Sequence, residues 1–310
     1  MWDKQHLLGL DDLSADDIAG LLDKAQHYRT TALDEDKPSQ ALSGRRVVLM
    51  FFENSTRTRV SFQIAGERLG AAVTALSMEA SSLKKGESLL DTVRTIDSMG
   101  VDFMVVRHSS SGAPWQIADA VSASVINAGD GTHEHPTQGL LDMLTIRQHK
   151  GAIRGLRVAI VGDVLHSRVA RSNLIGLTKM GASVVLVGPP TLVPESLKSL
   201  GAEISYSLDD VIHQCDVLNM LRIQRERLDG QYFPSVREYC ELYRLDSARM
   251  RRARADVLVM HPGPMNRGIE ITPDVADGAN SVILQQVSNG VAVRMAVLDT
   301  LNAARSARCP

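Results

Sequence analysis

The sequence predicts an α/β protein with two domains, each a mainly parallel sheet flanked by helices. Its 310 residues exceed what one hydrophobic core usually supports. Short apolar runs recur in both halves with amphipathic stretches between them, a pattern typical of βα units with parallel strands. The chain is 44% apolar and 23% charged with a formal net charge of -2, as in soluble globular proteins.

Eight apolar runs are expected to form the strands, four in each half. They span residues 45–52, 71–78, 101–107, 123–129, 156–163, 182–188, 215–221 and 255–264. The segments between them have helical spacing, and Val60, Ile64, Ala65 and Leu69 are expected to form one apolar stripe. A last helix is predicted at residues 288–307, and we expect it to pack back on the first domain.

The domain boundary is expected near residue 150. Charged and turn-forming residues interrupt the pattern at residues 147–157, just before a new strand begins. We therefore expect a first domain over residues 1–150, joined by the helix at 288–307, and a second domain over residues 151–287.

Several classes of protein are not supported. The only dense basic run, Arg249 to Arg254, is short and mixed with other residues, so we interpret it as a solvated helix face and expect no nucleic-acid partner. Three widely spaced cysteines form no disulfide or metal pattern, which predicts a reducing compartment. No stretch resembles a signal peptide or a membrane span, so we expect a cytoplasmic protein with no membrane partner.

The turn after the first predicted strand suits an anion. Ser55, Thr56, Arg57 and Thr58 lie where a helix is expected to begin, and a helix N-terminus offers unpaired N–H groups and partial positive charge. Ligands of open parallel sheets bind outside the carboxyl ends of the strands, so a phosphate is expected here. An ordinary serine or threonine cap with solvent-facing arginines explains the same residues.

The turns after the later strands add further polar side chains. These are Arg107, His133, His135, Gln138, Arg168, Arg222, Gln224 and Arg227. Alternatives remain for several of them, because an arginine can pair with a carboxylate or form a surface salt bridge. The two histidines lack the third ligand that zinc needs. No dinucleotide loop, triphosphate loop or nucleophile elbow is present in the sequence.

Seven motifs, in order along nearly the whole chain, resemble those of the transcarbamoylase family. They are "FFENSTRTR", "KKGES", "VVRH", "NAGDGTHEHPTQ", "VGDVLHSR", "RIQRER" and "HPGPMNRG". The resemblance is closest to the members that use L-aspartate. It implies transfer of the carbamoyl group of carbamoyl phosphate to the amine of L-aspartate, an early committed step of pyrimidine synthesis, without metal or cofactor.

The resemblance also implies a role for each matching residue of the carbamoyl-phosphate half. The phosphate would be held by Ser55, Thr56, Arg57, Thr58 and Ser81. The carbonyl oxygen of the carbamoyl group would be reached by Thr58, Arg107 and His135. The amide would be held by Gln138 and the carbonyls of Pro262, Gly263 and Pro264, with a cis Gly263–Pro264 bond.

The two carboxylates of aspartate would be held by Arg168, Arg222, Gln224 and Lys85. In the family, the residues matching Ser81 and Lys85 come from a neighbouring subunit, which implies a homotrimer; Ser82 is the adjacent alternative to Ser81. Glu53, Arg168 and Arg227 match residues that join the domains when the site closes. Arg59 is left as a structural cation paired with a nearby carboxylate.

Two alternative functions remain. A family member that uses ornithine has a His-Cys-Leu-Pro stretch where this chain has "HPGP", and Arg222 would repel ornithine's ammonium group. An inactive assembly subunit would not need the intact set Arg57, Lys85, Arg107 and His135. The "HPGPMNRG" form favours a plain trimer, or an assembly with dihydroorotase, over one with a separate regulatory chain.

Overall fold

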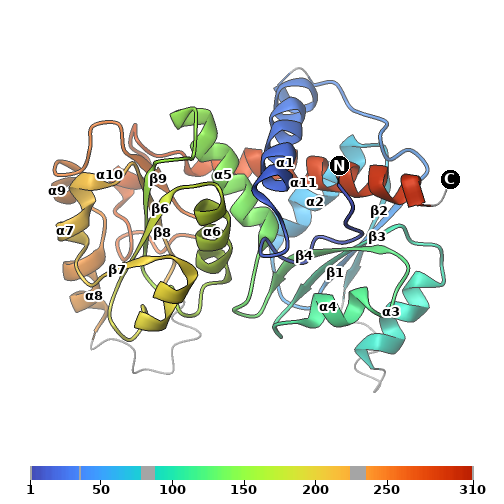
Figure 1. Cartoon of the computed structure of the whole chain (residues 1–310), viewed down its shortest axis with the longest axis horizontal. Coiled ribbons are helices and arrows are strands. Elements are labelled where there is room, and N and C mark those ends of the chain that lie inside the picture. The colour runs from blue at the N-terminus through green and yellow to red at the C-terminus, as the bar shows by residue number, and fades with distance from the viewer. Residues whose placement is uncertain (1, 35, 78–87, 224–234, 309–310) are drawn as a thin grey trace. The chain divides into compact units, whose positions relative to one another are not determined.

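The computed structural model describes residues 2–34, 36–77, 88–223 and 235–308. The chain forms two compact units, coloured along the chain in Figure 1. The first contains residues up to Leu144 and from Val287 onward, and the second runs from Thr145 to Gln286. Each unit has its own parallel sheet flanked by helices, which confirms the predicted fold class.

The first unit contains a four-stranded sheet in the order β2-β1-β3-β4, with every pair parallel. Its strands are β1 (Arg46–Phe51), β2 (Ala72–Ser77), β3 (Phe103–His108) and β4 (Ser124–Asp130). Parallel neighbours need crossover connections, and helices supply them here. The helices are α1 (Ala15–Tyr28), the π-helical η1 (Arg29–Asp34), α2 (Thr56–Arg68), α3 (Leu89–Asp97) and α4 (Ala113–Ala118).

Helices cover both faces of this sheet. Val93 of α3 and Ile117 of α4 pack against Met50 and Met104 on one face. On the other face, Gly66 of α2 comes so close to β2 that an added Cβ would lie 2.6 Å from a methyl group of Val73. The absence of a side chain at Gly66 therefore lets α2 lie directly on the sheet.

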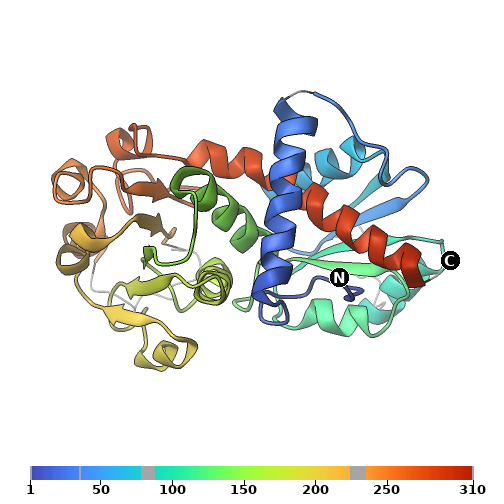
Figure 2. The ribbon, with the colours of Figure 1, turned by 45° about the horizontal axis from the view of Figure 1, so that its top comes forward.

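Two long helices cross the boundary between the units. They are α5 (Pro136–Lys150) and α11 (Ile283–Arg308). The part of α11 in the first unit packs on α1, because Tyr28 donates to Asp299 at 3.0 Å and Lys24 pairs with the same carboxylate. Figures 1 and 2 show α1 and α11 crossing on one side of the sheet. The predicted packing of the C-terminal helix on the first domain is confirmed.

The predicted apolar stripe on α2 is partly wrong. Ala65 and Leu69 are buried, but Val60 and Ile64 are 43% and 37% exposed. The buried face of α2 is made instead by Thr58, Ser61, Phe62, Ala65 and Gly66. Small and polar side chains fill much of this face, which fits the close approach of the helix to β2.

The second unit contains a five-stranded parallel sheet in the order β7-β6-β5-β8-β9. The strands are β5 (Arg157–Val161), β6 (Ser183–Val187), β7 (Glu203–Ser205), β8 (Val217–Met220) and β9 (Leu258–Met260). Only β7 was not predicted, because this three-residue edge strand has no apolar run. The helices are α6 (Arg168–Lys179), η4 (Glu195–Leu200), α7 (Leu208–Val211), η5 (Ile212–Gln214), α8 (Val236–Tyr243), α9 (Ser247–Met250) and α10 (Pro273–Ala276).

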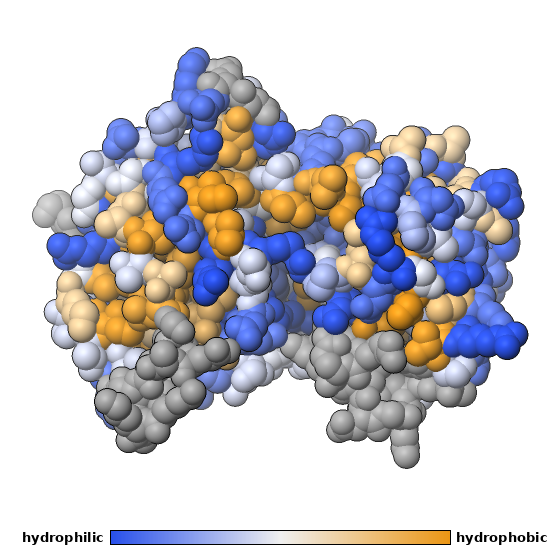
Figure 3. All heavy atoms as spheres, turned by 180° about the vertical axis from the view of Figure 1, so that it is seen from behind, coloured by the Kyte–Doolittle hydropathy of each residue, from blue (hydrophilic) through white to orange (hydrophobic). Residues whose placement is uncertain are grey.

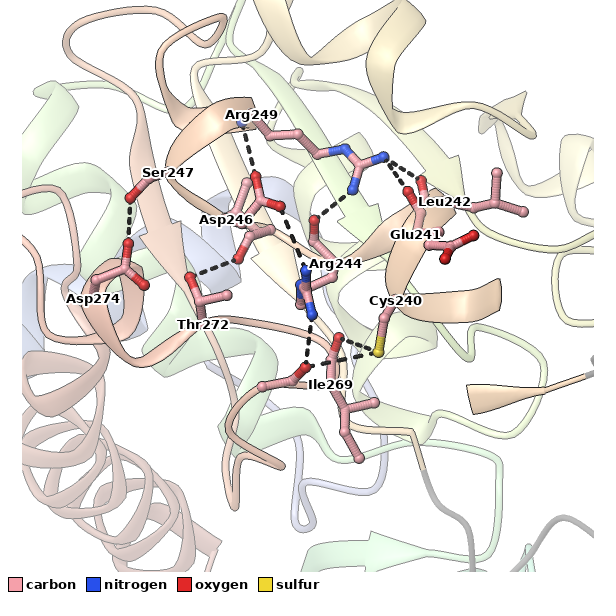
Figure 4. A network of polar contacts seen from close by, with 12 residues as sticks. Cys240, Glu241, Leu242, Arg244, Asp246, Ser247, Arg249, Ile269, Thr272 and Asp274 are labelled. Carbon is pink, nitrogen blue, oxygen red and sulfur yellow. Dashed lines mark hydrogen bonds and ion pairs between the residues drawn. The ribbon is translucent and has the colours of Figure 1, made fainter. Parts of the chain in front are cut away.

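The basic run at residues 249–254 is solvated as predicted at Arg251, Arg252 and Arg254, which are exposed, but the prediction is wrong for Arg249. Arg249 is only 9% exposed and pairs with Asp209 at 3.0 Å. Figure 4 shows its guanidinium donating to the carbonyls of Glu241, Leu242 and Arg244 at the end of α8. The last carbonyls of a helix have no intrahelical partner and carry partial negative charge, so they attract a buried cation.

The surface of the described residues is mixed in character. On the face drawn in Figure 3, apolar side chains alternate with polar and charged ones. None of the helices in the described ranges combines the length and hydropathy needed to cross a membrane.

Candidate functional site

The start of α2 lacks a side-chain capping bond, as do the starts of α7 and α10, whose N-cap residues are Ser207 and Thr272. The N-cap residue of α2, Ser55, has extended backbone angles but makes no side-chain capping hydrogen bond. Five other N-caps accept a hydrogen bond from the backbone N–H three residues later: Ser14, Ser88, Ser167, Ser235 and Asp246. Ser55 therefore does not cap α2 through its side chain, although Arg57 and Arg59 are exposed as the alternative of an ordinary cap expects. The Ser55 hydroxyl and the first N–H groups of α2 are not bonded to each other.

The two arginines of this turn lie on the exposed side of the helix, whereas Thr58 is only 7% exposed. Thr58 accepts a hydrogen bond at its carbonyl from the Ser61 hydroxyl. Among the described residues no ion pair involves Arg59, so the carboxylate partner predicted for it is not found there. Arg57 and Arg59 are thus two exposed arginines of the same turn. Arg57 is predicted to bind the phosphate, whereas Arg59 is predicted to be structural.

Arg107 lies next to this turn because β1 and β3 are neighbours, with Phe51 opposite Arg107 in the register. Its side chain is 11% exposed. One terminal nitrogen lies 3.4 Å from a carboxylate oxygen of Glu53, and the other donates to the carbonyl of Ala128 at 3.2 Å. The alternative that Arg107 pairs with a carboxylate is therefore correct, and Glu53 is the partner.

The turn between β4 and α5 is held by a buried carboxylate that the sequence analysis missed. Asp130 is fully buried and accepts hydrogen bonds from the N–H groups of Gly112 (2.7 Å) and Glu134 (3.1 Å) and from the Asn127 amide (2.8 Å). Burial raises the pKa of Asp130, but hydrogen bonds from His133 and these groups outweigh it and lower the pKa overall. The carboxylate therefore stays ionised and fixes the turn.

Two neighbouring residues, His133 and Glu134, support the structure of this turn. Glu134 is fully buried and accepts from the N–H of Leu10 at 3.0 Å. His133 lies 3.4 Å from Asp130 and packs edge-on against Trp115 with ring centroids 4.9 Å apart. Its ring therefore belongs to the scaffold of the turn. Within the described ranges, no group of three or more His, Cys, Asp or Glu side chains is arranged to hold a metal ion.

His135 directly precedes α5 and Gln138 lies in its first turn, where their spacing predicts a helix start. His135 is 4% exposed, and its carbonyl accepts from the N–H of Gln138 at 2.9 Å. The side-chain amide of Gln138 donates to Asp142 one turn further along α5, at 3.0 Å. In this structure the Gln138 amide is therefore held along the helix.

In the second unit, the turns after β5 and β8 lie at the same edge of the sheet because these strands are neighbours. Arg168 opens α6 behind the Ser167 cap and is 7% exposed. His166 and Asp163 fix the preceding turn, with 2.9 Å between the ring Nδ1 and the carboxylate. Arg222 follows β8 and is half-buried.

Five residues of the predicted site lie outside the described ranges. They are Ser81, its alternative Ser82, Lys85, Gln224 and Arg227. Their predicted roles therefore rest on the sequence.

The loop after β9 contains the predicted cis bond between Gly263 and Pro264, which is confirmed. His261 is 1% exposed and supports this loop: its Nδ1 accepts from the N–H of Gly263 at 2.8 Å, and its Nε2 lies 3.2 Å from Glu270. Since Nδ1 accepts, Nε2 carries the hydrogen that is donated to Glu270. Apart from the polar residue types, nothing in the sequence pattern indicated this buried support.

The loop after β9 is also tied to the loop after β8. The N–H of Asn266 donates to Glu270 at 2.5 Å, and the Asn266 side-chain amide donates to the carbonyl of Ile223 at 3.0 Å. Ile223 directly follows Arg222. Asn266 thus links two loops of the second unit. One loop contains the carbonyls of Pro262, Gly263 and Pro264, and the other contains Arg222, the arginine predicted to bind aspartate.

Two family models match most of the chain. Residues 5–148 match the model described as aspartate/ornithine carbamoyltransferase, carbamoyl-P binding domain. Residues 154–301 match the model described as aspartate/ornithine carbamoyltransferase, Asp/Orn binding domain.

Curated relatives are similar over nearly their whole length. The aspartate carbamoyltransferase catalytic subunit of Syntrophus aciditrophicus is 51% identical over 305 residues, covering 98% of this chain and 99% of the relative. The catalytic subunit of the same name from Salinispora tropica is 56% identical over 297 residues, covering 95% and 96%.

Solved structures of aspartate transcarbamoylase from Trypanosoma cruzi have the same fold. The complex with carbamoyl phosphate has a TM-score of 0.88 at 34% identity, covering 95% of each chain. The complex with carbamoyl phosphate and aspartate has a TM-score of 0.86 at 33% identity, covering 95% of this chain and 94% of the other.

Proposed function

Because the chain belongs to the aspartate/ornithine carbamoyltransferase family, we propose that it transfers the carbamoyl group of carbamoyl phosphate to the amine of L-aspartate. The products are N-carbamoyl-L-aspartate and phosphate. The observation that carries the proposal is the start of α2, where the Ser55 hydroxyl makes no capping bond and Arg107 lies near the end of the neighbouring strand β3. Relatives more than 50% identical are named for the same activity.

In the first unit, the phosphate binds at the start of α2, to Ser55, Thr56, Arg57 and Thr58, and Ser81 adds a further contact. N–H groups and partial positive charge at a helix start favour this anion. The carbonyl oxygen of the carbamoyl group accepts from Thr58, Arg107 and His135. When the substrate binds, Arg107 loses part of its contact with Glu53 and donates to the carbonyl oxygen of the carbamoyl group.

Arg168, Arg222 and Gln224 of the second unit bind the carboxylates of aspartate, and Lys85 adds a further cation. The carbonyls of Pro262, Gly263 and Pro264 accept hydrogen bonds from the carbamoyl amide, and Gln138 of the first unit also binds this amide. Two carboxylates need more than one cation, whereas the ammonium group of ornithine would be repelled by Arg222. Aspartate is therefore favoured over ornithine.

The chemistry follows from where charge develops. The aspartate amine attacks the carbamoyl carbon, the bond from that carbon to the phosphate oxygen breaks, and the departing phosphate takes the proton lost by the amine. Negative charge appears on the carbonyl oxygen and on the phosphate, where fixed donors stabilise it. Glu53, Arg168 and Arg227 join the domains when both substrates are bound.

The active assembly is a homotrimer in which Ser81 and Lys85 enter the site of a neighbouring subunit. A larger assembly with dihydroorotase fits the "HPGPMNRG" form better than one with a regulatory chain. The reaction takes place in the cytoplasm as an early step of pyrimidine synthesis.

The test is a side-by-side assay of the purified chain with carbamoyl phosphate and either L-aspartate or L-ornithine. The expected result is a kcat/KM for aspartate at least about 100-fold above that for ornithine, because the site's cations match only the first substrate. Equal rates with the two amino acids, or a preference for ornithine, would contradict the proposal.

A further inference from the structure

Arg294 is a buried cation of the first unit that none of the roles above uses. It lies on α11 and is 3% exposed. The carbon at the centre of its guanidinium lies 5.0 Å from the centre of the Phe62 ring on α2. One of its terminal nitrogens donates to the carbonyl of Gly290 at 2.9 Å. A Cβ added at Gly290 would lie 2.5 Å from that nitrogen, so the glycine leaves room for the guanidinium.

The charge of Arg294 is not balanced by a carboxylate. In the described ranges no ion pair involves it. Burial and, to a smaller extent, the positive charge of Arg107 together lower the pKa of Arg294 to about 9. The guanidinium remains charged at neutral pH because this pKa is above 7. A buried cation without a counter-charge destabilises a fold, so its presence calls for an anion that is not part of the chain.

The position of Arg294 points to that anion. Phe62 lies one turn after Thr58 on the buried face of α2, and Thr58 lies in the first turn of the same helix. Arg107, whose charge acts on Arg294, is the second-last residue of β3, the strand beside that turn. Arg294 thus contacts the buried face of α2 at Phe62, one turn from Thr58, and feels the charge of Arg107 beside the start of that helix.

We propose that Arg294 is a positioning residue whose counter-charge is the phosphate bound at the start of α2. The inference rests on the proposed function, because it takes the phosphate of carbamoyl phosphate as the ligand of that turn. Arg294 does not contact the ligand. Its charge raises the affinity for the anion, and anion binding in turn offsets the unfavourable burial of the guanidinium.

The test compares Arg294→Met and Arg294→Gln, which remove the charge, with Arg294→Lys, which keeps it. Arg305→Met is the matched control, since it removes one charge from an arginine of the same helix that lies near Asp102. Calorimetry measures the Kd of inorganic phosphate, and urea unfolding measures stability with and without phosphate. Initial rates give KM for carbamoyl phosphate and kcat.

The neutral variants should raise the phosphate Kd and the KM for carbamoyl phosphate about three- to tenfold, with kcat within about twofold of the parent. Without phosphate they should be as stable as the parent or more stable, and phosphate should stabilise them less. Arg294→Lys and Arg305→Met should leave the phosphate Kd within about twofold.

A packing role alone would give the opposite pattern. Neutral variants that are destabilised but bind phosphate as the parent does would overturn the inference. Failure of both neutral variants to fold would also overturn it, because the phosphate-free fold would then depend on the charge. If the parent itself does not bind phosphate, the anion site of the proposed function is wrong; if the parent binds and the variants bind equally well, only the role of Arg294 is wrong.

Discussion

The hydroxyl oxygen of Ser55 accepts no capping hydrogen bond, whereas the side-chain oxygens of five other N-cap residues do. Ser14 and Ser167, for example, accept from the N–H three residues later, and Ser55 does not. Because a capping bond satisfies donors that a phosphate would otherwise use, this difference favours a ligand at the start of α2. Arg57 lies in the same turn and adds a charge that stabilises the departing phosphate.

Arg57→Ala should lower kcat about 100-fold or more, since one donor to a developing oxyanion typically contributes that much. The initial rate of carbamoyl transfer measures the effect, and circular dichroism checks that the fold is retained. Arg59→Ala is the matched control: it removes an exposed arginine two residues away and should stay within a few-fold of the parent. An Arg57→Ala enzyme with similar activity to the control would rule out the role.

Arg222→Ala should raise the KM for aspartate about 10- to 100-fold, because a charged hydrogen bond to a carboxylate contributes roughly 1.5–3 kcal/mol. The KM for carbamoyl phosphate should change little. Steady-state kinetics with each substrate varied in turn separates the two effects. Equal damage to both KM values would mean that Arg222 does not act on aspartate.

At the scale of elements, the turn between β4 and α5 positions His135 through the carboxylates that precede it. Asp130 and Glu134 are fully buried, and each accepts backbone N–H groups. Their hydrogen bonds fix the chain directly before His135. The stability of this turn should therefore depend on the ionised state of Asp130.

Asp130→Asn should destabilise the protein at neutral pH by about 1–3 kcal/mol, through loss of charged hydrogen bonds. The folded-state pKa of Asp130 is lowered, so its contribution is present above the pKa of the unfolded chain, near 4, and is lost as the pH falls through the folded-state pKa. Urea unfolding between pH 7 and pH 3 measures this. The difference between parent and variant should shrink in acid.

The matched control is Asp277→Asn, which removes an exposed carboxylate paired with Arg267. It should change stability little at any pH in this range. If the Asp130→Asn difference stays constant from neutral pH to acid, the ionised carboxylate is not what holds the turn.

The elements themselves could largely be predicted from the sequence. Strands β1 and β5 are continuous apolar runs, which is the pattern of a buried parallel strand. The edge strand β7 has no such run and was missed. On α2 the apolar spacing indicated a helix correctly but gave the wrong face for Val60 and Ile64, because periodicity alone does not tell which side of a helix meets a sheet.

At the scale of the whole molecule, the fold places the described residues of each predicted group at the carboxyl edge of a sheet, one group in each unit. Motifs next to a strand, such as those of Ser55 and Arg107, could be found from the sequence because the turn and the strand are adjacent in the chain. Arg249 and Arg294 were misread or missed, because their partners, the end of α8 and Phe62, come from other segments that only the folded chain brings near.

The proposed trimer can be tested by mixing two inactive variants. Chains with Arg57→Ala and chains with Lys85→Ala should be nearly inactive alone, and subunit exchange between them should restore some activity. Each mixed trimer would contain interfaces where an intact Arg57 meets an intact Lys85. Each variant exchanged with itself is the control. Mixed trimers verified by native mass spectrometry but without activity would show that the two residues act in the same subunit.

The most direct test of the central claim is to follow the carbamoyl carbon itself. The purified chain is incubated with 13C-labelled carbamoyl phosphate and L-aspartate, and the reaction is followed by carbon and phosphorus nuclear magnetic resonance. The label should appear in N-carbamoyl-L-aspartate as an equal amount of phosphate is released, with no added metal or nucleotide. Release of phosphate without label in N-carbamoyl-L-aspartate would contradict the account.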